Sequence, residues 1–316
     1  MNDELHVALD DVEFVASFPL KGGHTARLIG TVRAEQETVR ESLRWEDVAG
    51  RVVERMGIEV QRVNWFSTYR VHHRVASAFQ RGRAFLLGDA AHIHSPVGGQ
   101  GMNTGIGDAV NLAWKLADVL HGRGPEALLD TYAPERTAFA RRLIATTDRG
   151  FTVATSPSAR ARVVRMRLLP RLLPVAVRLP SVRRLMFRIV SQIAIHYRGQ
   201  ALSAGKVGPV EGGDRLPWVE LDGASGRTDN YAALDGREWQ THVYGTPGAG
   251  IAEASAARGV AFHAFTWQDA MAKAGLTRNA LYVVRPDGYV ALADEGTSPA
   301  PLLAWVDAHL GGRVAR

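Results

Sequence analysis

The sequence predicts a mixed α/β and α+β fold: an antiparallel sheet, then a strand, glycine-rich loop and helix, then a separate β/α unit. Apolar and polar residues alternate over residues 1–33, and a period of two is typical of strands. An apolar run at 84–87 ends at Gly88, and a helical apolar stripe follows the glycine-rich segment 98–107. After residue 239, short apolar strand patterns alternate with helical ones.

The composition is that of a globular protein. Of 316 residues, 46% are hydrophobic, and ordinary domain sizes predict two or three domains. No run approaches the roughly 18 apolar residues that span a bilayer, and the N-terminus lacks the pattern of a signal peptide. We therefore expect a cytoplasmic protein. With no cysteine, disulfides, thiolate metal sites and cysteine nucleophiles are excluded.

The net charge of +6 comes largely from arginines between Arg160 and Arg198. These alternate with Leu, Val and Ile at near-helical spacing, which indicates solvated helical faces. RNA-binding signatures are absent from the sequence, so we expect no nucleic-acid partner. A membrane-surface helix is a weaker alternative, because prolines at 170, 174 and 180 divide the stretch into short pieces.

The N-terminal alternation predicts an antiparallel meander with one buried face, reversing at 10–11 and at 21–23. A helix is expected over 45–56, ending at Gly57. Further alternation over 63–75 leads into the apolar run described above, which reads as a strand buried on both faces.

The later elements complete the pattern. A helix is expected to begin near Asn103 and to end before Gly122, and the order strand, loop, helix builds a ligand crevice at strand carboxyl ends. Glycine-rich stretches at 205–213 and 223–226 indicate loops. The C-terminal unit has strands at 239–244, 260–265, 281–285 and 289–293, and helices near 251–258, 267–274 and 300–310.

Residues 81–120 carry the chemistry. Asp89, at a strand end, can accept hydrogen bonds from a ligand hydroxyl, and the glycines let backbone amides approach a flat ring. The following helix points its positive end at that ring and would stabilise an anion there.

This segment resembles the second FAD-binding motif of the class A flavin monooxygenases, which include para-hydroxybenzoate hydroxylase and phenol hydroxylase. The resemblance implies that Gly88 and Asp89 bind the cofactor, with the aspartate on the FAD ribitol. It also implies that a Pro-x-Gly-Gly-Gln-Gly-x-Asn loop lies against the isoalloxazine. The loop residues in this sequence are Pro96, Gly98, Gly99, Gln100, Gly101, Met102 and Asn103.

Weaker likeness extends over most of the chain. Residues 1–33 resemble the end of the family's substrate-binding sheet. Residues 197–199 and 213–217 resemble segments that border the C-terminal extension of phenol and polyketide hydroxylases, which is thioredoxin-like. Without cysteine this extension cannot perform dithiol chemistry. The expected domains are the end of the substrate-binding domain (1–64), the end of the Rossmann-like FAD-binding domain (65–160), an arginine-rich helical segment (161–205) and a thioredoxin-like domain (206–316).

The resemblance implies a FAD-dependent monooxygenase. NAD(P)H would reduce FAD, O2 would form the flavin C4a-hydroperoxide, and a small aromatic or polyketide-like substrate would be hydroxylated. No side chain is expected to act as a catalytic acid or base, because the cofactor performs the difficult chemistry. We expect no metal and no membrane partner, and a homodimer stays possible.

The chain departs from the family in lacking a Gly-x-Gly-x-x-Gly segment before Trp65. We therefore expect it to begin inside the substrate domain, as a fragment, a mis-set start or a truncated gene would, and to bind FAD only weakly by itself. Two alternatives stay open. One is a noncatalytic chain or subunit that needs an FAD-domain partner, and the other is a related epoxidase or halogenase. Lys21 and Lys115 fit the halogenase lysine poorly by position.

Other residues receive simpler interpretations. His92 and His94 are spaced for a shared metal, with His72 and His73 nearby, but no further ligand spacing supports such a site. Asp108 is interpreted as complementing the helix dipole. The aromatic residues at 65, 66 and 69 are expected in the core.

Overall fold

The computed structural model describes residues 6–9, 14–21, 25–30, 44–47, 57–68, 72–93, 100–156, 158–223 and 226–311. The chain divides into two compact units, each assembled from separate stretches. The first comprises Met1–His73, His94–Gly99 and Leu143–Phe187. The second comprises Arg74–Ile93, Gln100–Arg142 and Arg188–Arg316, and it contains the turn at Gly88 and Asp89.

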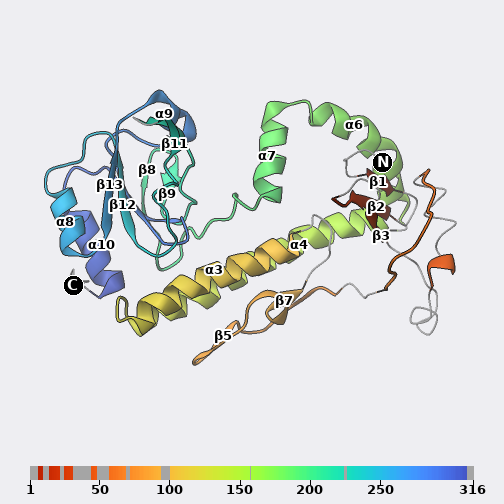
Figure 1. Cartoon of the computed structure of the whole chain (residues 1–316), viewed down its shortest axis with the longest axis horizontal. Coiled ribbons are helices and arrows are strands. Elements are labelled where there is room, and N and C mark those ends of the chain that lie inside the picture. Colours follow the sequence, from red (N-terminus) through yellow and green to blue (C-terminus); the bar gives the residue numbers. More distant parts are fainter. Residues whose placement is uncertain are drawn as a thin grey trace. The chain divides into compact units, whose positions relative to one another are not determined.

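The expected N-terminal meander is confirmed as an antiparallel sheet in the order β1-β2-β3 (Figure 1). Its strands are β1 (His6–Leu9), β2 (Phe14–Pro19) and β3 (Ala26–Gly30). In the central strand, Val15, Ala16 and Ser17 are all buried. Because consecutive strand residues point to opposite faces, both faces of β2 are covered there, unlike the single buried face expected. Of the helix expected over 45–56, residues 45–47 are helical and the rest lie outside the described residues.

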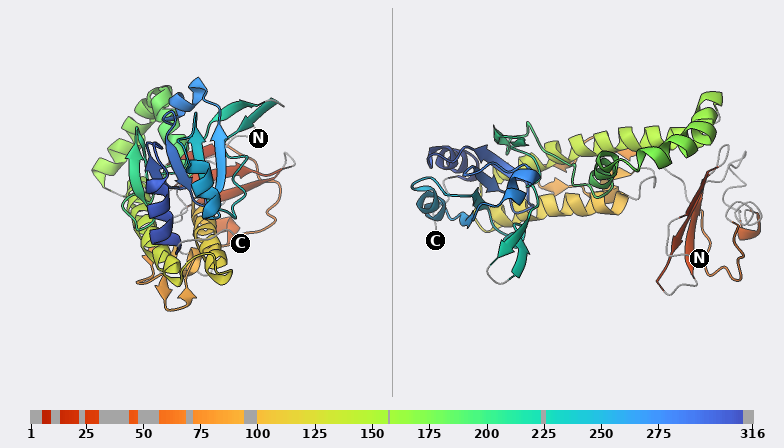
Figure 2. Two further views of the ribbon diagram at one scale, coloured as in Figure 1. Left: turned by 90° about the vertical axis from the view of Figure 1, so that its left-hand side faces the viewer. Right: turned by 90° about the horizontal axis from the view of Figure 1, so that it is seen from above.

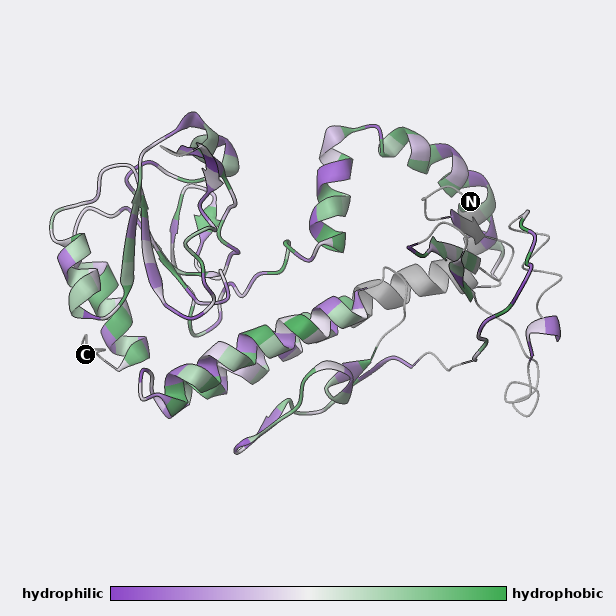
Figure 3. Ribbon diagram, in the orientation of Figure 1, coloured by the Kyte–Doolittle hydropathy of each residue, from purple (hydrophilic) through white to green (hydrophobic). Residues whose placement is uncertain are grey.

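The arginine-rich stretch is helical, but its prolines divide it less than predicted: Pro170 and Pro174 lie within one helix, and only Pro180 begins a new one. The helices are α5 (Ala159–Val163), the π-helical turn η3 (Val164–Leu168), α6 (Leu169–Ala176) and α7 (Pro180–Val190). Hydrophilic and hydrophobic residues alternate along α6 and α7 (Figure 3), and large apolar side chains such as Leu172 and Phe187 are exposed. In the described part of the chain, no helix combines the length and apolar character needed to cross a bilayer.

The segment before Gly88 is less regular than its sequence predicts. Residues 57–68 contain no strand, and β6 (Ala84–Phe85) forms only a short hairpin with β5 (Gln80–Arg81). Leu86 and Leu87 are 39% and 38% exposed, so the expectation of a strand buried on both faces is wrong here. Such burial requires neighbouring strands and covering helices, which the described residues do not supply at this point.

The expected helix after the glycine-rich loop is confirmed as α3 (Gly101–Leu120), which Gly122 follows with a φ of +66°. The chain then turns through the 3-10 helix η2 (Glu126–Thr131) into α4 (Tyr132–Thr155). The beginning of α4 runs back alongside α3 (Figures 1 and 2). This pairing places residues of α4 next to the helix that follows the candidate flavin loop.

The C-terminal strands form a six-stranded sheet in the order β13-β12-β14-β15-β8-β9. The four predicted strands are confirmed as β12 (Gln240–Tyr244), β13 (Ala261–Phe265), β14 (Leu281–Val284) and β15 (Val290–Asp294). The predicted helices are confirmed as α8 (Ile251–Ala257), α9 (Asp269–Ala274) and α10 (Ala300–Leu310). Strands β12 and β13 are parallel, whereas β14 is antiparallel to both of its neighbours.

The pattern did not predict β8 (Ala204–Val207), β9 (Val210–Glu211) or the hairpin of β10 (Glu220–Gly223) and β11 (Gly226–Asp229). Strand β8 pairs in parallel with β15, and its Gly205 has a φ of +71°. A Cβ at Gly205 would overlap the backbone of Ala293. The glycines that read as loop signals therefore permit close backbone approach within the sheet.

Helix α3 shares a core with the C-terminal sheet. Trp114 of α3 and Leu128 of η2 pack in one apolar cluster with Trp239 and Trp305. The Trp114 and Trp239 rings meet edge to face with centroids 5.3 Å apart, a favourable aromatic geometry. Trp239 Nε1 also donates to Asp118 Oδ2 at 2.9 Å.

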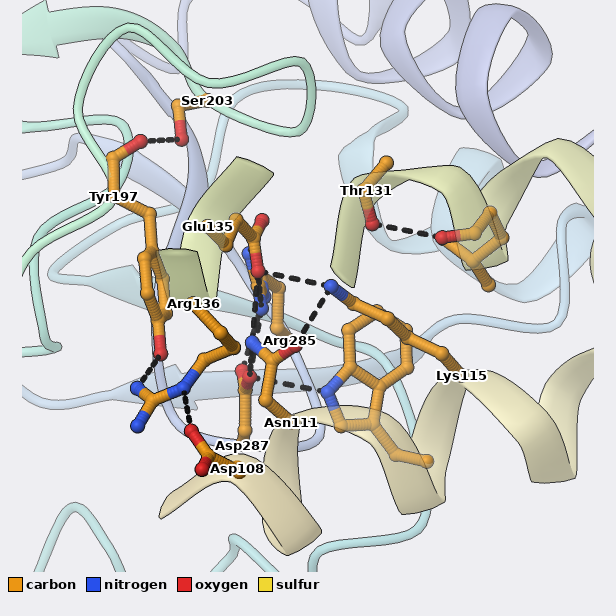
Figure 4. Close-up of polar contacts among 12 residues, drawn as sticks. Asp108, Asn111, Lys115, Thr131, Glu135, Arg136, Tyr197, Ser203, Arg285 and Asp287 are labelled. Carbon is orange, nitrogen blue, oxygen red and sulfur yellow. Dashed lines mark hydrogen bonds and ion pairs between the residues drawn. The ribbon is translucent and has the colours of Figure 1, made fainter. Parts of the chain in front are cut away.

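A buried polar network joins α3 and α4 to the turn between β14 and β15 (Figure 4). Arg285 donates to both carboxylate oxygens of Glu135, at 2.7 and 3.0 Å, and to Asp287. Lys115 Nζ donates to Glu135 Oε2 and to Asn111 Oδ1, each at 2.9 Å. The side chains of Lys115, Glu135 and Arg285 are completely buried, so each charge depends on its partners.

The pKa values of this network reflect its buried charges. Burial alone would raise the pKa of Glu135, but the positive charges of Arg285 and Lys115 and the hydrogen bonds from Arg285 and Asn111 outweigh it and lower the pKa to about 2. Burial, aided by the nearby charge of Arg285, lowers the pKa of Lys115 to about 8, although Glu135 opposes this shift. Both side chains are therefore ionised at neutral pH.

The segment that enters the C-terminal sheet is fixed by backbone contacts. The N–H of Tyr197 donates to the carbonyl of Gly213 at 2.7 Å, and the N–H of Gly213 donates to the carbonyl of Val290. Gly213 has a φ of +94°, and a Cβ on it would overlap the backbone of Tyr197 and Arg198. Only glycine fits this crossing of chains.

Gly213→Ala should lower the free energy of unfolding by about 2 to 5 kcal/mol, the sum of a left-handed backbone cost of about 1 to 2 kcal/mol and an overpacking cost of about 1 to 3 kcal/mol. Gly199→Ala is the matched control, because Gly199 also has a positive φ, +71°, but a Cβ there would meet no atom within 4 Å. Urea unfolding followed by circular dichroism measures both. If the free energy of unfolding fell equally in the two variants, the overlap of the added Cβ with the backbone could not be the cause.

Acidification should lower the free energy of unfolding between about pH 5 and pH 2. The pKa of Glu135 is lower in the folded chain, about 2, than in the unfolded chain. Its stabilising contribution is therefore complete above the unfolded pKa and disappears as pH falls through the folded one. Urea midpoints across this range, compared with those of Glu135→Gln, test this expectation. The variant should show a shallower decline, and an unchanged slope would contradict the assignment.

Candidate functional site

The candidate flavin turn lies directly against α3. The 3-10 turn η1 (Gly88–Ala90) begins at Gly88, which has a φ of +57°. A Cβ built on Gly105 of α3 would lie 3.3 Å from the Gly88 Cα. The turn and the helix thus meet backbone to backbone, and the Asp89 side chain that follows is exposed.

The structure places the predicted loop residues in different environments. Pro96, Gly98 and Gly99 lie outside the described residues. Gln100 precedes α3 and is buried, whereas Met102 is 75% exposed and Asn103 is also exposed. No acidic residue lies in the first turn of α3, so the free backbone N–H groups and the dipole at this end favour an anion.

Two glutamines, Gln100 and Gln192, hold the start of α3. Gln100 Nε2 donates to the carbonyl of Ile189 at 2.9 Å. Gln192 Nε2 donates to the Gln100 carbonyl at 3.2 Å and to Thr104 Oγ1 at 2.8 Å. Gln192 has a φ of +60°, a strained value for a residue other than glycine. The side-chain nitrogen and the carbonyl of Gln100 are thus bonded within the protein, so the predicted cofactor contact would use its backbone N–H.

Asp108 has a different role from the one its position in sequence suggested. It is 1% exposed and lies in the second turn of α3, behind the flavin turn. Its Oδ2 accepts the N–H of Gly88 at 2.9 Å and lies 2.7 Å from His92 Nε2, while Oδ1 accepts Arg136 Nε at 2.6 Å. The interpretation of Asp108 as a helix-dipole residue is therefore replaced by one in which it bridges the turn, α3 and α4.

The partners of Asp108 determine its charge. Burial alone would raise its pKa, but the hydrogen bond with His92, the charge of Arg136 and the N–H of Gly88 outweigh burial and lower it. An ionised carboxylate only accepts hydrogen bonds, so His92 Nε2 carries the shared proton. Arg136 also donates to the Tyr197 hydroxyl at 2.9 Å and to the Thr104 carbonyl at 3.1 Å.

Other candidate sites receive no support from the geometry. His92 is engaged with Asp108, and in the part of the chain that the structure describes no cluster of three or more potential ligands could hold a metal. Lys115 is buried in its ion pair with Glu135, which is unsuited to the lysine of a halogenase. Trp65 is 73% exposed, so the expectation that it lies in the core is wrong.

The sequence did not distinguish the buried charges of α3 from an exposed polar face. The buried polar residues of this helix recur every three or four positions and so share one helical face: Thr104, Asp108, Asn111, Lys115 and Asp118. A second stripe is apolar and exposed, with Met102, Ile106 and Val110 at 75%, 53% and 48%. This distribution is the reverse of an ordinary surface helix.

Comparison with known proteins finds one matching family and several relatives similar in sequence. Residues 4–147 match the family described as FAD binding domain. A 6-methylpretetramide 4-monooxygenase from Streptomyces rimosus is 35% identical over 309 residues, which cover 88% of this chain and 53% of that protein. A dialkyldecalin synthase from Streptomyces rugosporus is 34% identical over 216 residues, covering 68% of this chain and 42% of that protein.

A solved structure agrees along almost the whole chain. CabE, an aromatic hydroxylase from angucycline biosynthesis, has a TM-score of 0.74 and 31% identity, covering 98% of this chain and 61% of that one. The chain spans about half the length of the curated relatives described above. From the glycine–aspartate turn, the helix behind it and these likenesses, we conclude that the chain belongs to the family of FAD-dependent aromatic monooxygenases.

Proposed function

We propose that this chain forms part of a monooxygenase that uses FAD, NAD(P)H and O2 to hydroxylate a small aromatic or polyketide-like molecule. The observation that carries the proposal is the Gly88–Asp89 turn, which packs backbone to backbone on Gly105 near the N-terminal end of a 20-residue helix. A glycine turn, an exposed carboxylate and a helix N-terminus together suit a ligand that carries hydroxyls and develops negative charge.

The described residues fit FAD in this place. The Asp89 carboxylate is exposed, which leaves it available to the ribitol hydroxyls. The exposed Met102 side chain and the first-turn amides of α3 would face the isoalloxazine, with Gly101 and Asn103 beside them. Gly88 and the backbone N–H of Gln100 belong to the same proposed site. Pro96, Gly98 and Gly99 lie outside the described residues, and they are proposed as cofactor-binding residues from the sequence resemblance alone.

FAD, reduced by NAD(P)H, would supply the oxygen-activating chemistry. The residues of this chain bind and orient the cofactor, and the positive end of α3 stabilises negative charge that develops next to it. No side chain of the described site is assigned as a proton donor or acceptor. Asp108, which is buried and bound to Arg136, is not accessible to a substrate.

The domain assignments are also proposals: residues 1–64 and 65–160 as the ends of the substrate-binding and FAD-binding domains, 161–205 as a helical segment, and 206–316 as a thioredoxin-like domain. Support for the last comes from the strand order β13-β12-β14-β15 with helices between strands. We propose that this C-terminal domain has a structural role, or that it contributes to a homodimer.

The exposed apolar residues support the alternative of a chain completed by further protein. Leu86, Leu87, Met102, Ile106 and Val110 leave apolar surface open beside the candidate cofactor site, and exposed apolar patches commonly mark interaction surfaces. The relatives named above contain more chain than this one spans. A separate polypeptide that carries the rest of the FAD-binding domain could cover this apolar surface.

Titration of the chain with FAD, followed by flavin fluorescence, tests the proposal. Binding should be micromolar or weaker for the chain alone. It should tighten when the part of a relative that this chain does not span is added. That mixture should then oxidise NAD(P)H in response to an aromatic substrate and yield a hydroxylated product by mass spectrometry. No FAD binding in either preparation would refute the proposal, and binding without oxygen consumption would favour the noncatalytic alternative.

Asp89→Ala should weaken FAD binding by about 1.5 to 3 kcal/mol, the usual size of a hydrogen bond to a charged group, or roughly 10- to 150-fold. The fold should be unaffected, because the Asp89 side chain is exposed. Asp269→Ala, which removes an exposed carboxylate at the start of α9, is the matched control and should retain wild-type affinity. Unchanged FAD binding in Asp89→Ala would refute the assignment of the motif.

A further inference from the structure

We propose that Asp108 is the positioning residue of the flavin turn, and that Arg136 and His92 hold its carboxylate so that Gly88 and Asp89 lie in one fixed position against α3. The expected effect on cofactor binding rests on the proposed function. The contact between the turn and α3 does not, because it involves only atoms of this chain.

The hydrogen bond from Gly88 to Asp108 connects the turn itself to α3, whereas hydrogen bonds from Tyr132 to Leu86 and from Ala76 to Ala91 fix the chain on either side. Gly88 adopts a left-handed conformation, and the Ala91 N–H closes the turn on the Gly88 carbonyl at 2.9 Å. Between Gly88 and Gly105 there is no side chain, since both are glycine. The Asp108 carboxylate, 2.9 Å from the Gly88 nitrogen, is therefore the directional contact that sets how the turn sits on the helix.

Arg136 holds the carboxylate while it makes two further contacts, one to α3 and one to Tyr197. It donates to Asp108, to the Thr104 carbonyl of α3 and to the Tyr197 hydroxyl. Space for this guanidinium depends on Gly107, because a Cβ there would lie 3.2 Å from Arg136 Nη2. Since a guanidinium donates in a rigid planar fork, these contacts together fix the position of Asp108.

The consequence for ligand binding follows from chain connectivity. Asp89 is joined directly to Gly88, so a change in the Gly88 backbone dihedrals moves the Asp89 carboxylate. Asp108 itself is buried and does not reach a ligand. It acts through the turn, as a positioning residue.

Asp118 provides a matched control on the same helix. It is fully buried, and it accepts Arg123 Nε at 2.8 Å and Trp239 Nε1 at 2.9 Å. At ten residues from Asp108, it lies about 15 Å farther along the helix axis. Asp118→Asn therefore disturbs a buried carboxylate of α3 without disturbing the flavin turn.

The experiment compares Asp108→Asn with Asp118→Asn in the full chain. Asparagine keeps the shape of the side chain but replaces one acceptor oxygen with a donor, so it cannot satisfy Gly88, His92 and Arg136 together. Three quantities are measured: the hydrogen-exchange rate of the Gly88 amide by NMR, the urea midpoint, and FAD affinity in the preparation used to test the proposed function.

Both variants should lower the urea midpoint. Asp108→Asn alone should speed Gly88 exchange by about 10-fold or more and weaken FAD binding by about 10- to 100-fold, the effect of losing a hydrogen bond to a charged group. Asp118→Asn should leave both quantities within about 3-fold of wild type. If Asp108→Asn does not fold, Tyr197→Phe, which removes one contact of Arg136, should shift both quantities in the same direction by a few-fold.

Unchanged Gly88 exchange in Asp108→Asn, or equal losses of FAD affinity in the Asp108 and Asp118 variants, would overturn the positioning role. If only Tyr197→Phe folds and it alters neither quantity, the positioning role is overturned as well. Failure of the unmutated chain to bind FAD in any preparation refutes the proposed function instead. The exchange comparison then decides the positioning role by itself.

Discussion

The buried ion pair between Arg285 and Glu135 is the contact on which the arrangement of the second unit depends. Three cations, Lys115, Arg136 and Arg285, are buried with three carboxylates, Asp108, Glu135 and Asp287. An interior charge without its partner costs several kcal/mol. Helices α3 and α4 and the β14–β15 turn can therefore pack only in an arrangement that pairs every one of these charges.

Two neighbouring residues of α4 form ion pairs with different parts of the second unit. Glu135 and Arg136 are consecutive, so their side chains leave the helix about 100° apart. Glu135 faces the C-terminal turn through Arg285, and Arg136 faces the flavin turn through Asp108. Tyr197 connects the two sets of contacts, because its hydroxyl accepts Arg136 and its ring lies 5.0 Å from the Arg285 guanidinium carbon. The C-terminal sheet and the candidate cofactor turn are thus held by one continuous group of buried side chains.

Under the proposed function, the residues that bind the cofactor differ from those that determine the reaction. In the proposed function, the turn, the helix behind it and the buried charges provide position and electrostatics. Relatives similar in sequence include both a monooxygenase and a dialkyldecalin synthase. The exposed apolar stripe of α3 lies on the same helix as the buried charges. Cofactor, substrate or further protein would contact this outer stripe, where chemical differences between relatives are expected to arise.

The sequence by itself determined the local elements. Period-two alternation predicted the N-terminal meander, periodicity and glycines predicted α3, and residues 239–310 were assigned almost element by element, because these signals depend on near neighbours. The order of residues around Asp89 also identified the family.

Which faces of these helices and strands are buried was decided only by the tertiary structure. Asp108 was interpreted as a helix-dipole residue and the run 84–87 as a buried strand, and both interpretations were wrong. A charge is buried only where a partner meets it, and Arg285 is 150 residues from Glu135. Short-range periodicity carries no information about contacts at that separation.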